Sequence, residues 1–157
     1  MEWKGVMPAI TTKFTDSDKL DINLFNKNLD FQLKSGVDAI VLAGSLGEAS
    51  TLTQDEKNIL TKNTVDFVNK KIPVVVNIAE QSTRDAIKSV KDAEKYGANG
   101  LMVLPPMRYK SGKKETINYF ESIANSTSLP IMVYNNPVDY GIEVTIDMFE
   151  NLLKCDN

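Results

Sequence analysis

The chain has 157 residues, of which 42% are hydrophobic and 25% are charged, a composition typical of one globular domain. Its formal net charge of −3 provides no basic excess, so nucleic acid is not an expected partner. The absence of histidine excludes Ser-His-Asp triads, histidine-ligated zinc and histidine general bases within one chain.

The single cysteine, Cys155, cannot form an internal disulfide, which suits a reducing cytoplasm. Without a histidine to activate it, Cys155 is also a poor nucleophile. No apolar run approaches the ~18 residues that a membrane span needs, and the apolar part of residues 1–14 is too short for a signal peptide. We therefore expect a cytoplasmic protein with no membrane partner, and the sequence predicts neither a metal site nor a cofactor.

Five apolar runs predict β-strands. They are rich in Val, Ile, Leu or Met, and after the first run they lack clean apolar–polar alternation, which is typical of strands buried on both faces of a parallel sheet. The runs are residues 5–10, 38–44, 72–79, 100–104 and 129–134.

Polar segments with helical periodicity follow these runs. The first, residues 21–36, ends at Gly36. The second begins with Thr53 and Glu56 in the spacing of a capping box, and the third begins at Ser82. The last two segments are residues 113–127 and 145–157. We expect a single domain, residues 1–157, of five strand–helix units.

Two α/β architectures fit such a series. A five-stranded doubly wound sheet of the flavodoxin type would use this length, whereas an eight-stranded βα barrel takes about 250 residues. The loops favour the barrel, because residues 11–21 after the first run contain no glycine-rich phosphate cradle. Residues that could bind a ligand or take part in catalysis follow the second and fifth runs instead.

The loop after the second run, residues 44–48, is the first candidate site. Gly44 and Gly47 would allow positive φ angles and a close approach of peptide N–H groups to a ligand. Ser45 could donate to a carboxylate or pass a proton. An ordinary βα turn is the alternative interpretation.

Two further candidates follow later strands. Tyr134 ends the fifth run, where the active-site rim of a barrel would lie, although a tyrosine there can equally be part of the core. The loop containing Arg108, Tyr109 and Lys110 could bind an anion or a neighbouring subunit, or could simply be solvated.

Four segments together resemble the dihydrodipicolinate synthase / N-acetylneuraminate lyase family. They are "GVMPAITTKF", "GSLGEASTLTQDEK", "VLPPMRY" and "LPIMVYNNP", and their order and spacing agree across the chain. The resemblance implies a partial TIM (β/α)8 barrel of about the first five βα units, in a homo-oligomer that is typically a tetramer. It also implies a class I lyase or aldolase, in which a lysine forms a Schiff base with pyruvate or another 2-oxo acid.

By this resemblance, residues Gly44, Ser45, Leu46 and Gly47 bind the carboxylate of the 2-oxo acid through peptide N–H groups and the Ser45 hydroxyl. Tyr134 would be the proton relay of the family, coupled to Ser45. Both roles make chemical sense, since preorganised donors stabilise charge that develops during the reaction.

The departures from the family pattern bear on the second substrate. Leu46 stands where many members carry a second hydroxyl, and Met107 lies near the position of a tyrosine that dihydrodipicolinate synthases lend to the adjacent subunit. Asp139 replaces an arginine that binds the carboxylate of aspartate semialdehyde. We therefore expect the chain to be closer to members that dehydrate, deaminate or cleave sugar-derived or hydroxyproline-derived 2-oxo acids.

The family places its Schiff-base lysine on the sixth strand, and this sequence stops at Asn157, before that strand. No lysine in the chain ends a predicted strand, where desolvation could lower its pKa. We therefore expect a barrel truncated before strand six and inactive alone. The alternatives are a non-catalytic half-barrel that assembles with another chain, and a complete flavodoxin-like module that binds flavin or phosphate.

Overall fold

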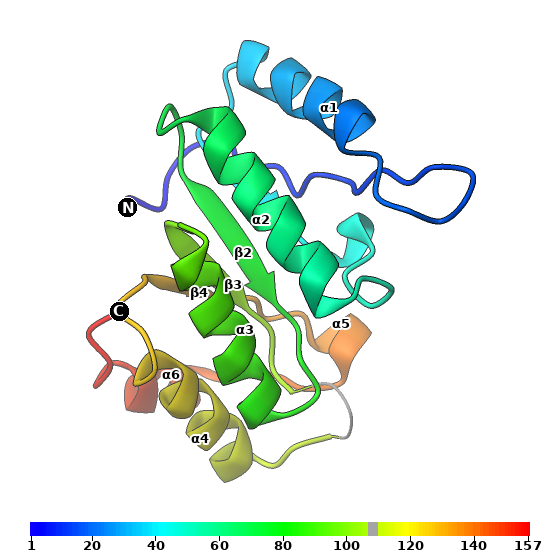
Figure 1. The fold of residues 1–157 in the computed structure, drawn as a ribbon. Helices are drawn as coiled ribbons and strands as arrows, with labels where there is room; N and C mark the ends of the chain where they lie inside the picture. The colour runs from blue at the N-terminus through cyan, green and yellow to red at the C-terminus, as the bar shows by residue number, and fades with distance from the viewer. Residues whose placement is uncertain (107–109) are drawn as a thin grey trace.

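A computed structural model describes residues 1–106 and 110–157. Its centre is a four-stranded parallel sheet whose strands are adjacent in chain order, β1-β2-β3-β4 (Figure 1). The strands are β1 (Ile40–Leu42), β2 (Val74–Ile78), β3 (Gly100–Val103) and β4 (Ile131–Val133). They confirm four of the five predicted strands.

The first predicted strand forms only an isolated parallel bridge, between Ala9 and Val41. Pro8 accepts a hydrogen bond from the Val41 N–H, and Ile10 donates one to the Val41 carbonyl, each at 3.0 Å. The ladder is short because Pro8 has no N–H to donate. Residues 5–10 still lie beside β1, at the position that a first barrel strand would take.

Helices follow the strands, as the periodicity predicted. They are α1 (Ile22–Lys34), α2 (Gln54–Val68), α3 (Thr83–Lys95), α4 (Lys113–Ala124), the short α5 (Pro137–Tyr140) and α6 (Ile146–Leu152). The capping box of Thr53 and Glu56 is present at the start of α2, and Ser82 caps α3. Gly36 lies just past the end of α1 with φ +77°, a conformation that glycine adopts without a steric penalty.

The helices cover one face of the sheet. Successive helices α1, α2, α3 and α4 contact one another in a row (Figure 1). Along each strand, alternate side chains enter the core beneath this row, and the others face the opposite, inner side. The core side includes Ile40, Leu42, Val74, Val76, Ile78, Leu101 and Val103.

The strand order separates the two architectures that the sequence allowed. A flavodoxin-like sheet reverses its strand order and has helices on both faces. Here the order is sequential, and each right-handed crossover puts its helix on the same side of the sheet. The sheet is therefore an arc of a βα barrel.

Candidate active site

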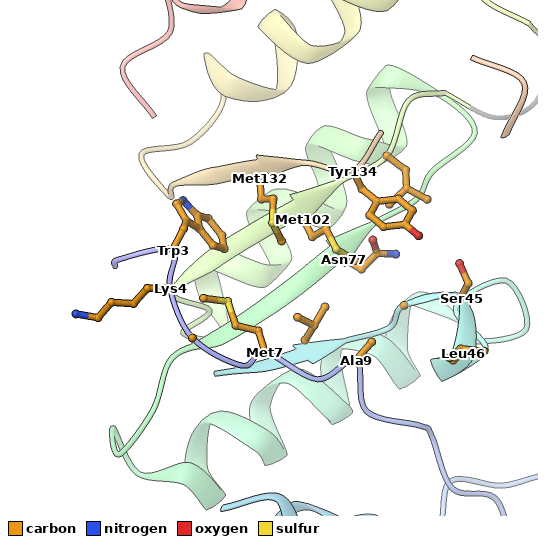
Figure 2. A pocket seen from close by; sticks show the side chains of 14 residues that line it. Trp3, Lys4, Met7, Ala9, Ser45, Leu46, Asn77, Met102, Met132 and Tyr134 are labelled. Carbon is orange, nitrogen blue, oxygen red and sulfur yellow. The ribbon is translucent and has the colours of Figure 1, made fainter. Parts of the chain in front are cut away.

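The inner face of this arc lines a cavity of about 540 Å³. Ser45 and Tyr134 lie at the end of the cavity where the strands terminate, and Trp3 and Lys4 lie at the opposite end (Figure 2). The carboxyl ends of barrel strands are where active sites of this architecture form. The described lining is Trp3, Lys4, Gly5, Met7, Ala9, Val41, Gly44, Ser45, Leu46, Asn77, Met102, Leu104, Met132 and Tyr134.

The loop after β1 folds as a single 3-10 turn, Ser45–Gly47. Positive φ angles were expected at its glycines, but Gly44 has φ −72° and the left-handed residues are Ala43 and Glu48, at φ 52° and 59°. A non-glycine residue in this region costs on the order of 1 kcal/mol or more, and such strain concentrates at functional sites. The flanking residues, and not the glycines, therefore make the sharp turn.

The turn leaves backbone donors available. Among the described residues, no acceptor is present for the N–H groups of Ser45 and Leu46, as expected for the first turn of a helix. The N–H groups of Gly47 and Glu48 are already used within the turn, donating to Gly44 and Ser45 at 2.9 and 3.1 Å. Gly44, Ser45 and Leu46 line the cavity, so this rim includes both residues whose N–H groups have no acceptor in the described part of the chain, together with the Ser45 side chain.

Gly47, the last of the four residues predicted to bind the carboxylate, packs against the N-terminal segment. It is buried, and its carbonyl accepts a hydrogen bond of 2.6 Å from the Thr12 hydroxyl. A Cβ at this position would lie 3.0 Å from the Ile10 carbonyl oxygen. Gly47 therefore fits the turn against the N-terminal segment, and it is absent from the described cavity lining.

The hydroxyl partner of Ser45 is Tyr140, at the end of α5. The two hydroxyls share a hydrogen bond of 2.8 Å. We expected the partner to be Tyr134, whose ring instead contacts Tyr140 edge to face with centroids 6.1 Å apart. The Tyr134 hydroxyl accepts a long hydrogen bond of 3.4 Å from Asn136. The structure thus assembles Ser45, Tyr134 and Tyr140 at one rim, with Tyr140 in direct contact with the serine.

Asn77 is a second residue that the sequence reasoning missed. Its Nδ2 donates to the Ala43 carbonyl at 2.8 Å, which ties β2 to the strained residue before the loop. The signal was visible, since asparagine is depleted in strands and "VVVNIA" places one inside an apolar run. Asn77 lines the same cavity as Ser45.

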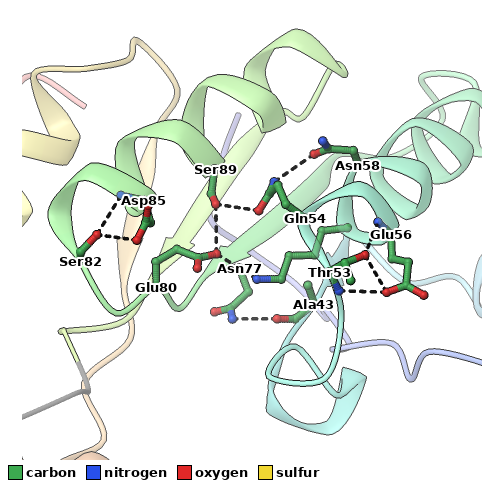
Figure 3. Close-up of polar contacts among 11 residues, drawn as sticks. Ala43, Thr53, Gln54, Glu56, Asn58, Asn77, Glu80, Ser82, Asp85 and Ser89 are labelled. Atoms are coloured by element: carbon green, nitrogen blue, oxygen red, sulfur yellow. Dashed lines mark hydrogen bonds and ion pairs between the residues drawn. The ribbon is translucent and has the colours of Figure 1, made fainter.

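A polar cluster lies on the helix side of the sheet (Figure 3). Lys57 and Glu80 form an ion pair of 2.9 Å whose side chains are only 14% and 18% exposed. The Ser89 hydroxyl lies within hydrogen-bonding distance of Glu80 and Gln54, at 3.0 and 2.9 Å. These contacts join α2, α3 and the end of β2, and so they hold the scaffold beneath the site.

The remaining sequence candidates lie elsewhere. Met107, Arg108 and Tyr109 fall outside the described residues, and Lys110 lines a separate cavity of about 490 Å³. Asp139 is exposed and accepts a hydrogen bond of 2.7 Å from Asn136 at the start of α5.

Among the described residues that line the cavity, Lys4 is the lysine. It lies at the end of the cavity opposite Tyr134, and its ammonium group points away from the cavity (Figure 2). It pairs with Glu2.

The single cysteine, Cys155, is not a favourable nucleophile in the structure. Burial raises the pKa of its thiol, and the nearby carboxylates of Glu121 and Asp156 raise it further, which disfavours the nucleophilic thiolate.

Comparison with known proteins shows which family this chain resembles. The profile of the Dihydrodipicolinate synthetase family matches residues 2–157. The chain belongs to this family. A 4-hydroxy-tetrahydrodipicolinate synthase of Rickettsia bellii is 37% identical over 152 residues, which cover 97% of this chain and 51% of the relative. The chain thus spans about half the length of the curated relatives it matches.

Solved structures of the family have the same fold. The 4-hydroxy-tetrahydrodipicolinate synthase of Methylacidiphilum fumariolicum SolV superposes with a TM-score of 0.95 at 30% identity, covering 99% of this chain and 51% of that one. YagE, an E. coli K12 prophage protein of the family solved in complex with pyruvate, gives 0.92 at 31% identity, covering 97% and 51%. These matches confirm the partial barrel. None of the helices described in residues 1–106 and 110–157 is long and apolar enough to cross a membrane.

Proposed function

We propose that this chain provides the oxo-acid-binding side of a Schiff-base lyase or aldolase site. The carboxylate of pyruvate or another 2-oxo acid binds to the N–H groups of Ser45 and Leu46 and to the Ser45 hydroxyl. The observation that carries the proposal is that both N–H groups lack a protein acceptor among the described residues and belong to residues that line the cavity. Such fixed donors need little reorganisation when a charged group binds. YagE, a family relative, binds pyruvate.

Proton transfer at the site is assigned to Tyr134. Its hydroxyl has only the long contact with Asn136 among the described residues, so it is free to exchange a proton with a bound substrate. Tyr140 acts differently, because its hydrogen bond of 2.8 Å fixes the rotamer of Ser45. Together they orient the Ser45 hydroxyl towards the substrate carboxylate and supply a hydroxyl chain for proton exchange.

Pyruvate affinity tests this site directly. Isothermal titration of the chain with pyruvate should give saturable binding, and Ser45→Ala should weaken it about 10-fold, the cost of a hydrogen bond to a charged group. Thr51→Ala is the matched control, since the Thr51 hydroxyl caps the Glu48 carbonyl and is absent from the described cavity lining. Equal affinities for wild type and Ser45→Ala would contradict the assignment.

The Schiff-base lysine is not supplied by these 157 residues. All the lysines of the chain lie within the described residues, and the one beside the cavity, Lys4, points away from it. We therefore propose that the chain alone binds an oxo acid without catalysing its reaction. Incubation with pyruvate and borohydride followed by mass spectrometry should show no covalent adduct, and a stable adduct on any lysine would overturn this part of the proposal.

Aspartate semialdehyde is not the second substrate under this proposal. The Asp139 carboxylate lies exposed near the rim, held by Asn136, and like charge there would repel a carboxylate on the incoming aldehyde. Sugar-derived or hydroxyproline-derived 2-oxo acids fit this position better. In competition titrations these 2-oxo acids should displace pyruvate, because their carboxylate would bind the same loop, whereas aspartate semialdehyde should not bind beside pyruvate.

A second proposal concerns assembly. All three residues of β4 are half-buried, and β4 is the last strand of the sheet, so one of its edges is unpaired among the described residues. Its residues Ile131 and Val133 also border an apolar cavity of about 260 Å³ lined by α4 and α6. Unpaired strand edges favour association. A second copy of the chain would cover this edge, giving a homo-oligomer in which half-barrels complete one another. Sedimentation at micromolar concentration should show a dimer or larger species, and a monomer would argue against the assembly.

A further inference from the structure

The turn proposed to bind the carboxylate is held rigid by its own backbone. The Gly44 carbonyl accepts a hydrogen bond from the Gly47 N–H at 2.9 Å, and the Ser45 carbonyl accepts one from Glu48 at 3.1 Å. In a trans peptide the C=O and N–H bonds lie in one plane and point in opposite directions. These contacts therefore fix the directions of the Ser45 and Leu46 N–H bonds relative to the turn.

The orientation of this turn on the sheet depends on how it is attached to β1. The register between β1 and β2 joins Leu42 to Val76, and β1 ends at that pair. The same register brings the next two residues, Ala43 and Asn77, opposite each other. Here the Asn77 side chain donates a hydrogen bond of 2.8 Å from Nδ2 to the Ala43 carbonyl (Figure 3). The contact is thus made where the chain leaves the sheet and enters the turn.

Ala43 adopts a backbone conformation that its side chain disfavours. Its φ angle is 52°, in the left-handed region, where a Cβ crowds the following carbonyl oxygen. Gly44 follows with extended backbone, at ψ 177°, and leads into the turn. A relaxation of Ala43 to a negative φ would therefore rotate the whole turn relative to the sheet. The hydrogen bond to the Ala43 carbonyl opposes this relaxation.

The same contact explains why an asparagine lies inside an apolar strand. Its β2 neighbours Val76 and Ile78 enter the helix-covered core, so Asn77 faces the inner side of the sheet. Asparagine is depleted in strands, and burial of its amide is unfavourable unless the amide is hydrogen-bonded. Because Asn77 is only 4% exposed, its influence on a bound molecule passes through the Ala43 backbone and not through direct contact.

We propose that Asn77 is a positioning residue, which holds Ala43 in the left-handed conformation and so orients the N–H groups of residues 45–46 towards the carboxylate of the 2-oxo acid. The inference rests on the proposed function of the turn and deepens it, because it names the contact that keeps the two donors in place before the ligand arrives. Donors that are fixed in advance need little reorganisation when a charged group binds.

Two substitutions on the inner face of β2 separate positioning from stability. Asn77→Leu removes the donor at nearly constant volume, and in isothermal titration it should weaken pyruvate binding by the full chain about 10-fold, the factor that one hydrogen bond is worth. Val75→Ala is the matched control, because Val75 is fully buried two residues earlier on the same face and is absent from the described cavity lining. It should lower the melting temperature and leave the pyruvate affinity unchanged.

Glycine at position 43 tests the route through the backbone. Glycine adopts the left-handed region without a steric penalty, so it does not need the Asn77 contact to remain there. Ala43→Gly combined with Asn77→Leu should therefore bind pyruvate more tightly than Asn77→Leu alone. Removal of a methyl group would not repair a defect in the packing of the sheet, so this recovery separates positioning from a merely structural role.

Amide chemical shifts of the ligand-free, 15N-labelled chain give a second readout. Asn77→Leu should move the Ser45 and Leu46 amides, whereas Val75→Ala should leave them in place. Asn77→Val gives the same tests should the leucine variant not fold, since valine is favoured in strands.

Each outcome decides the inference. Weaker binding by Asn77→Leu that recovers with Ala43→Gly supports it. Equal pyruvate affinity in the wild type and the Asn77 variants, no recovery with Ala43→Gly, or an equal loss in Val75→Ala overturns the positioning role and leaves the proposed function standing. Failure of the wild-type chain to bind pyruvate overturns the proposed function together with the inference.

Discussion

Substitution of Gly47 by alanine tests how the candidate site is held against the N-terminal segment. The added Cβ would lie 3.0 Å from the Ile10 carbonyl oxygen and 3.8 Å from the Thr12 hydroxyl. The first contact is with backbone, which cannot rotate away as a side chain can. The same residue also accepts the buried 2.6 Å hydrogen bond from Thr12, so a shift that relieves the contact lengthens that bond.

Overpacking of this kind costs about 1–3 kcal/mol. For a chain of this size a loss of 1 kcal/mol lowers the melting temperature by about 2–4 °C. Gly47→Ala should therefore melt about 4–8 °C below the wild type if the cost is about 2 kcal/mol.

Gly44→Ala is the matched control in the same loop. Its Cβ would meet only the Ala9 Cβ, at 3.4 Å, and φ at this position is −72°. Any residue can adopt that angle. Differential scanning calorimetry should therefore find Gly44→Ala within about 1 °C of the wild type. Equal melting temperatures for the two variants would refute the packing role of Gly47.

Three further predictions concern the scaffold. Lys57→Ala should lower the free energy of unfolding in urea by about 3 kcal/mol, because it leaves the largely buried Glu80 carboxylate without its cation. Lys62→Ala is the control on the same helix: it breaks an ion pair whose side chains are 62% and 64% exposed, and it should lower that free energy by at most about 0.5 kcal/mol. Tyr119→Phe should not lower the melting temperature, since among the described residues the buried Tyr119 hydroxyl has no partner to lose; a clear drop would reveal one. The Thr53 N–H and then its hydroxyl lower the pKa of Glu56 below its ordinary value of 4.5, so the stabilisation by this carboxylate is complete above that value and is lost as pH falls through the depressed pKa. The melting difference between wild type and Glu56→Gln should accordingly shrink from pH 7 to pH 3, and a constant difference would contradict the linkage.

Local patterns in the sequence were sufficient to predict most of the fold. Apolar runs predicted β1 to β4. The capping side chains of Thr53 and Ser82 predicted where two helices begin, and the backbone freedom of Gly36 predicted where α1 ends. The run at residues 5–10 was wrong as a full strand, because Pro8 interrupts the donors of the ladder and leaves one bridge. Such edge pairing depends on the partner strand and not only on the run itself.

The site was predicted only in part, because its contacts join residues far apart in the sequence. Ser45 and Tyr134 do lie at one rim, but the partner of Ser45 is Tyr140, brought there by a short helical turn. Pro137, the first residue of that turn, and Gly141, which follows its last residue, were the available signal. The positive φ angles at Ala43 and Glu48 had no local signal, since both residues disfavour them.

The central claim is that Ser45 and Leu46 offer their N–H groups to an oxo-acid carboxylate. Titration of the 15N-labelled chain with pyruvate, followed by amide chemical shifts, measures this most directly. We predict large saturable shifts for the Ser45 and Leu46 amides and smaller ones for Gly47 and Glu48, whose N–H groups already donate within the turn. Unchanged Ser45 and Leu46 amides, or shifts confined to other parts of the chain, would contradict the claim.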